Sequence, residues 1–136
     1  MDGQGRSWVR SPVVGGILGV FAGGLVILLL ESAGHRLFGT AEPSDLTSVT
    51  GAMFGSVLFA WVAGSWVGGA VASYWSRARS VWPGAVVGLV LLAAAVSNMV
   101  AIPHPMWLMA SAVILVPGAA IVASRRGRMR LAGGKA

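Results

Sequence analysis

Four long apolar stretches run along the chain, and short segments that hold most of its charged residues separate them. We place these stretches at about residues 13–30, 49–72, 84–102 and 106–123. A helix needs about 20 mostly apolar residues to cross the hydrocarbon core of a bilayer. All four meet or approach this length, and the fourth contains Pro117, which we expect to kink its helix. The pattern predicts an all-α fold: an integral membrane, antiparallel four-helix bundle that forms a single domain over residues 1–136.

The composition supports a membrane environment. Of the 136 residues, 56% are apolar and only 10% are charged, whereas a soluble domain carries about 25% charged residues. There is no cysteine, which excludes disulfides, thiolate metal sites and thiol catalysis. The first apolar stretch is longer than the roughly 7–15 apolar residues of a cleaved signal peptide. We therefore expect it to remain as a membrane helix.

The distribution of charge predicts the orientation in the membrane. If the N-terminus is cytoplasmic and the chain crosses four times, nine of the ten basic residues fall inside and only Arg36 falls outside. This asymmetry is the one that inner-membrane proteins show, so both termini are predicted to be cytoplasmic. A net charge of +6 is then explained by the bilayer, and we expect no nucleic-acid partner. The cytoplasmic residues expected to contact anionic lipid are Arg77, Arg79, Arg125, Arg126, Arg128 and Arg130.

Small residues recur every fourth position on the first two apolar stretches. Membrane helices associate where small residues let their backbones approach closely. The first stretch has a double GxxxG step, and the second has a small residue at each fourth position. The residues we expect at such contacts are Gly15, Gly19, Gly23, Ala60, Gly64, Gly68 and Ala72. Whether they face their own bundle or another subunit stays open at this point.

A set of polar residues is predicted to gather at the outer end of the bundle. Glu31 and His35 are four positions apart, so their side chains can meet on one helix face. His104 lies between two prolines, which favour a stiff, non-helical turn. The full outer polar cluster that we expect is Glu31, His35, Arg36, Asp45, Asn98 and His104.

Several kinds of chemistry fit this cluster. It could be a hydrogen-bond network in which Glu31 pairs with His35 or Arg36. Glu31, His35 and His104 are also ligand types that suit zinc, iron, manganese or copper, although the chain has no HExxH and no second ExxH motif. Proton or ion transport would need polar residues deeper in the bundle. A serine hydrolase would need a GxSxG elbow, which the chain lacks.

Two short motifs support a resemblance. They are Glu31-Ser-Ala-Gly34-His35 and His104-Pro105-Met-Trp107, and they are accompanied by Pro43-Ser-Asp45, Gly68-Gly69 and Asn98. With these residues the chain resembles a group of small bacterial four-helix inner-membrane proteins. In that group the first helix ends in E-x-x-G-H and an H-P-x-W turn precedes the fourth helix. The resemblance covers roughly residues 31–120. It implies a multi-pass protein of the bacterial cytoplasmic (inner) membrane and no particular activity.

From these observations we expect a non-enzymatic integral membrane protein. It would be an accessory subunit of a larger membrane complex or a homo-oligomer, with membrane lipids and other membrane subunits or copies of itself as partners. The alternative is a metal- or haem-binding membrane protein with its Glu/His site at the outer face. A proton- or ion-coupled transporter is the third hypothesis. The residue pattern itself requires no cofactor.

Overall fold

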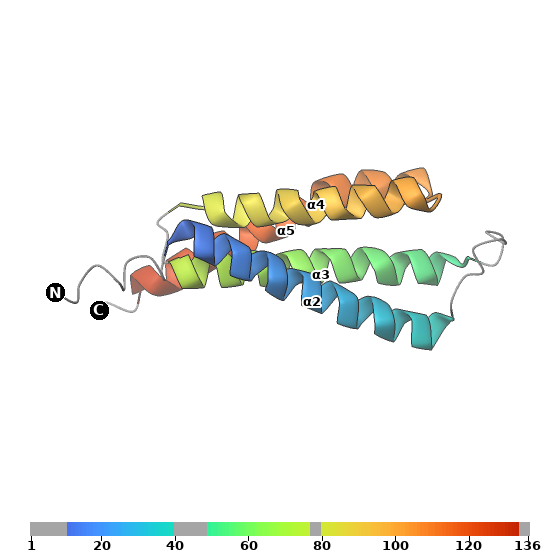
Figure 1. Cartoon of the computed structure of the whole chain (residues 1–136), viewed down its shortest axis with the longest axis horizontal. Coiled ribbons are helices and arrows are strands. Elements are labelled where there is room, and N and C mark those ends of the chain that lie inside the picture. Colours follow the sequence, from blue (N-terminus) through green and yellow to red (C-terminus); the bar gives the residue numbers. More distant parts are fainter. Residues whose placement is uncertain (1–10, 40–48, 77–79, 134–136) are drawn as a thin grey trace.

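The computed structural model describes residues 11–39, 49–76 and 80–133, with side chains as far as Arg126. The described residues form four helices: α2 (Pro12–Phe38), α3 (Gly51–Ser76), α4 (Trp82–Ala101) and α5 (Met106–Gly133) (Figure 1). Each helix is long and apolar enough to cross a membrane. The prediction of an all-α protein with four candidate membrane spans is confirmed.

Two of the helices extend well beyond the apolar stretches that predict them. Helix α2 has 27 residues and ends only at Gly39, whose φ of 87° suits glycine. At about 1.5 Å per residue it is about 40 Å long, which exceeds a hydrocarbon core of about 30 Å. Glu31 and His35 therefore lie on α2 close to its outer end. Helix α5 likewise continues through Pro117 as far as Gly133, so the basic segment after residue 123 is helical.

Helix α3 occupies the centre of the bundle and packs against the other three helices (Figure 1). The start of α2 and the end of α5 lie at the same end of the molecule, which we call the terminal end. Figure 1 also shows α2 running obliquely, so that its Phe38 end lies far from the α4–α5 turn. The helices are thus close together at the terminal end and spread apart at the opposite end.

The small-residue stripes of α2 and α3 meet inside this one chain. In order along α2, the glycines Gly15, Gly19 and Gly23 face Ala72, Gly68 and Gly64 of α3. A Cβ atom added at Gly19 would lie 2.5 Å from the carbonyl oxygen of Gly68, and one at Gly23 would lie 2.7 Å from that of Gly64. Only glycine permits this backbone approach. Ala60, also on α3, is fully buried.

A second close contact joins α4 and α5 at the same end. A Cβ atom at Gly88 would lie 2.9 Å from Cα of Pro117, and one at Gly84 would overlap Ser124. The Ser124 hydroxyl donates a 3.1 Å hydrogen bond to the carbonyl oxygen of Gly69, which ties α5 to α3. In the other half of the bundle the core is built from larger side chains, among them Trp61, Leu91, Met99 and Leu108.

Candidate functional site

A cavity of about 500 Å³ with several polar side chains in its lining lies at the spread end of the bundle. We call it the outer pocket. Its walls come from α2, α3, the end of α4 and the turn that precedes α5. The volume falls within the range of about 300–1,000 Å³ that small-molecule sites occupy. The polar side chains that line it are Glu31, His35, Ser56, Asn98 and His104.

Glu31 is held in the pocket wall by a tryptophan of another helix. The indole Nε1 of Trp61 donates a 2.7 Å hydrogen bond to Oε1 of Glu31. Trp61 is only 3% exposed, so its ring is fixed by packing and loses little freedom when it makes this bond. His35 and Arg36 are exposed at the last turn of α2. The hydrogen-bond donor to Oε1 of Glu31 is therefore Trp61, which differs from both partners, His35 and Arg36, considered for a hydrogen-bond network.

His104 is positioned by its turn and by two aromatic rings. Residues 102–105 are not helical, and Nδ1 of His104 lies within hydrogen-bond distance of the carbonyl oxygen of Ile102. A carbonyl oxygen can only accept, so Nδ1 carries the hydrogen and Nε2 of the neutral ring keeps its lone pair. The ring centroid lies 5.7 Å from that of Phe54 and 6.1 Å from that of Trp61. Trp61 therefore contacts both Glu31 and His104.

The glycine of the E-x-x-G-H motif brings α2 against α3 at this wall. Gly34 is buried, and a Cβ atom there would lie 2.8 Å from the Ser56 hydroxyl oxygen. The Ser56 hydroxyl donates a 2.8 Å hydrogen bond to the carbonyl oxygen of Met53. Its hydrogen is thereby used within α3, and its oxygen can still accept a hydrogen bond.

The structure brings together most of the predicted outer cluster. Glu31, His35, Asn98 and His104 line one cavity, whereas Arg36 is exposed and lies outside its lining. Asp45 lies outside the described residues.

The predicted lipid-contacting arginines lie at the terminal end or in segments that the structure does not describe. Arg125 and Arg126 are exposed. The Arg126 guanidinium lies 5.0 Å from the ring centroid of Trp66, a cation–π distance. The remaining four, Arg77, Arg79, Arg128 and Arg130, have no described side chain.

The pocket was also a candidate metal site. In the described ranges, no three His, Cys, Asp or Glu side chains are grouped closely enough to hold a metal ion. Glu31, His35 and His104 share the pocket lining, but one oxygen of Glu31 already accepts from Trp61 and Nδ1 of His104 already faces a backbone carbonyl. The groups left for a ligand are the second carboxylate oxygen of Glu31, Nε2 of His104 and the imidazole of His35.

Trp61 is the site residue that we did not predict. Tryptophans of membrane proteins concentrate at the two interfaces, yet Trp61 lies ten positions into α3. A tryptophan at this depth needs a hydrogen-bond acceptor for its N–H group. Its position in the apolar stretch is thus the signal that could have pointed to Glu31.

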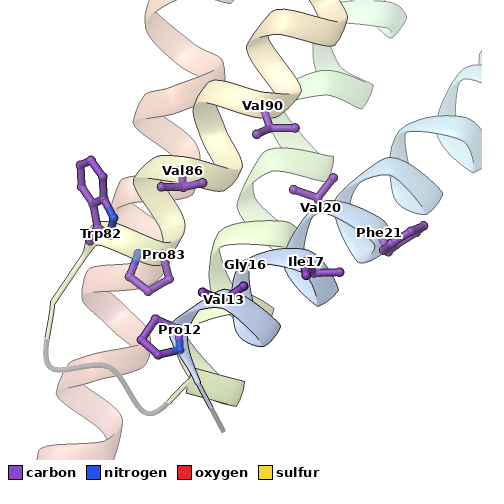
Figure 2. A pocket seen from close by; sticks show the side chains of 10 residues that line it. All are labelled: Pro12, Val13, Gly16, Ile17, Val20, Phe21, Trp82, Pro83, Val86 and Val90. Carbon is purple, nitrogen blue, oxygen red and sulfur yellow. The ribbon is translucent and has the colours of Figure 1, made fainter. Parts of the chain in front are cut away.

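A second cavity, of about 410 Å³, lies between α2 and α4 at the terminal end. Figure 2 shows Val13, Ile17 and Val20 of α2 on one side and Trp82 and Val86 of α4 on the other. Apart from the indole nitrogen of Trp82, these side chains offer no polar group. The groove is therefore apolar and offers little to orient a polar ligand.

No family model, no curated protein and no solved structure matches the chain. We therefore infer the function from the geometry of the outer pocket.

Proposed function

We propose that this chain is a non-enzymatic protein of a bacterial cytoplasmic membrane that binds a ligand in the outer pocket. The observation that supports this most directly is the carboxylate of Glu31, which Trp61 holds in the wall of a 500 Å³ cavity. A buried tryptophan that fixes a carboxylate beside an oriented imidazole is the kind of preorganised arrangement that binding sites require. The small volume and mixed lining fit a small molecule or the polar group of a larger one.

Binding fits this pocket better than catalysis. The serine hydroxyl that lines it, that of Ser56, donates to the carbonyl oxygen of Met53. A serine nucleophile needs its hydroxyl hydrogen bonded to a general base. Glu31 and His104 could act as bases, but the hydroxyl of Ser56 does not donate to either of them. The described lining therefore shows no activated serine nucleophile.

The orientation places the pocket on the outer side of the membrane. The start of α2 and the end of α5 lie at one end (Figure 1), and nine of the ten basic residues flank the segments at that end in sequence. The positive-inside rule makes that end cytoplasmic. The outer pocket then opens toward the external face, within reach of the outer leaflet and of external solutes.

An accessory or self-assembling role cannot use the small-residue stripes of α2 and α3 as its contact surface. Gly19 and Gly23 face Gly68 and Gly64 of the same chain, so they are used within the bundle. A partner subunit would have to bind elsewhere, and the pocket, with its polar groups turned toward a cavity, is the better supported site of interaction.

The proposal is tested by native mass spectrometry of the protein, gently extracted from its host membrane. We expect a species heavier than the 13.9 kDa chain by the mass of a small ligand. Ala101 lines the pocket, and Ala101→Trp should fill the cavity and remove that mass. The matched control is Val100→Trp, at a neighbouring position that is 83% exposed and outside the pocket lining, which should retain it.

Two outcomes contradict the proposal. One is a wild-type protein that carries no ligand, or a ligand mass that Ala101→Trp leaves in place. The other is a foreign subunit or a homo-oligomer whose mass is the same in all three proteins, which would favour the accessory-subunit or self-assembly hypothesis instead.

A further inference from the structure

The geometry of the outer pocket points to a chemical class of ligand: we infer that it binds a primary ammonium group. This inference rests on the proposed binding function and adds the identity of the group recognised. Among the described residues that line the pocket, Glu31 is the only carboxylate and there is neither lysine nor arginine. The described lining therefore offers a carboxylate to a cationic group.

Glu31, His104 and Ser56 can accept hydrogen bonds from a cation, whereas the other two polar side chains of the lining, His35 and Asn98, can donate as well as accept. A carboxylate can only accept hydrogen bonds, and only Oε1 of Glu31 is used, by Trp61. His104 offers the lone pair of Nε2, because its Nδ1 hydrogen faces the carbonyl oxygen of Ile102. The oxygen of Ser56 is also an acceptor, since its hydrogen is donated to Met53. A primary ammonium group has three donors and no acceptor, which complements this set.

An aromatic ring of the site favours the same ligand. Phe54 lines the pocket, and its ring centroid lies 5.7 Å from that of His104. A cation close to an aromatic face gains about 0.5–2 kcal/mol, and more as it is desolvated. A trimethylammonium group would gain this term too, but it has no N–H donor for Glu31 or His104. The combination of charge, acceptors and an aromatic ring thus discriminates between a primary and a quaternary amine.

The depth of Glu31 makes a membrane amine as accessible as a dissolved one. Glu31 is seven positions before the last residue of α2, about 10 Å along the helix axis. Since α2 exceeds the hydrocarbon core by about 10 Å in total, Glu31 lies near the boundary between the acyl chains and the headgroups. The ammonium group could come from an aminophospholipid headgroup or from a free external amine, and the experiment separates these sources.

The test uses purified full-length protein in a neutral detergent and four probes. These are ethanolamine, choline, dihexanoyl phosphatidylethanolamine and dihexanoyl phosphatidylcholine. Tryptophan fluorescence reports binding, because Trp61 forms part of the site. We expect at least one ethanolamine probe to bind tenfold or more tightly than its choline counterpart. If free ethanolamine binds more tightly than choline, a soluble amine is a sufficient ligand. If only phosphatidylethanolamine binds more tightly than its choline counterpart, the ligand is a lipid headgroup.

Two variants test the assignment of the recognising atoms. Glu31→Gln removes the charge but keeps an oxygen that accepts from Trp61, and it should weaken ethanolamine-probe binding at least tenfold. His104→Phe keeps the ring packing and removes Nε2, and it should weaken binding several-fold. The matched control is Ser32→Ala, since Ser32 is exposed and its hydroxyl donates only to Leu28 within α2. This control should bind as the wild type does.

Failure of this inference can be distinguished from failure of the proposed function. Equal binding of the ethanolamine and choline probes, or unchanged binding by Glu31→Gln, overturns the ammonium assignment. Tight binding of Zn²⁺ that is lost in both Glu31→Gln and His104→Phe overturns it in favour of a metal site. If the native ligand mass still disappears in Ala101→Trp, the binding function stands while the ammonium assignment falls. If that mass never appears, both fall.

Discussion

Replacing Gly19 with alanine should force α2 and α3 apart, whereas the same change at Gly16 should not. The Cβ atom at Gly19 would lie 2.5 Å from the carbonyl oxygen of Gly68 and 2.9 Å from Cγ2 of Val87. Ordinary contact begins at about 3.4 Å, so the neighbours must retreat by up to about 0.9 Å. Around Gly16 no atom lies within 4 Å of the added Cβ.

The two substitutions share the gain in helix propensity, about 1 kcal/mol for glycine to alanine. Only Gly19→Ala also has the cost of overpacking, typically about 1–3 kcal/mol. If the new Cβ pushes α2 and α3 apart by 0.5–1 Å, the contact between them also loses about a quarter to a half of its dispersion energy. We expect Gly19→Ala to lower the free energy of unfolding by about 1–2 kcal/mol. Gly16→Ala should leave it unchanged or raise it by up to about 1 kcal/mol.

The measurement is reversible unfolding in mixed micelles with increasing dodecyl sulfate, followed by circular dichroism. Gly16→Ala is the matched control, because it makes the same chemical change in the same helix. If the two variants unfold at the same dodecyl sulfate fraction, or Gly19→Ala is the more stable one, the close contact between α2 and α3 is not what stabilises the bundle.

Three further substitutions can be measured in the same unfolding assay. Trp61→Phe keeps most of the buried ring but removes the donor to Glu31, so we expect a loss of about 1–3 kcal/mol; wild-type stability would contradict that bond. Ser124→Ala removes the hydrogen bond to the carbonyl oxygen of Gly69 and should cost about 1 kcal/mol. Ser65→Ala should instead be neutral or stabilising by about 1 kcal/mol, because the Ser65 hydroxyl is buried without a hydrogen-bond partner in the described structure. A cost as large as that of Ser124→Ala would show that Ser65 has a partner after all.

The periodicity of apolar residues was enough to predict the four helices, because membrane length and backbone hydrogen bonding leave few alternatives. It could not predict their ends. Hydrophobicity reports the part of a helix that lipid surrounds, whereas α2 continues to Phe38 and α5 to Gly133, beyond the apolar stretches. The direction in which the small residues face also needed the structure, since one stripe suits a neighbouring helix of the same chain and a separate subunit equally well.

The site was predicted in part for a similar reason. Glu31, Asn98 and His104 could be grouped because topology brings the outer ends of different helices together. The partner of Glu31 could not be found by this argument, since it looks only for polar residues at the same end. Trp61 belongs to the apolar stretch by composition, and its single N–H group reaches Glu31 only because of the way α2 crosses α3.

The two glycine contacts have a consequence for how the protein is made. Each joins consecutive helices, α2 with α3 and α4 with α5, so each hairpin can close soon after its second helix leaves the translocon. The hydrogen bond from Ser124 to Gly69, whose residues are 55 positions apart, can form only after nearly the whole chain has been synthesised. The outer pocket needs α2, α3, the end of α4 and His104 together. A newly made chain can therefore complete the pocket only once its two hairpins have docked.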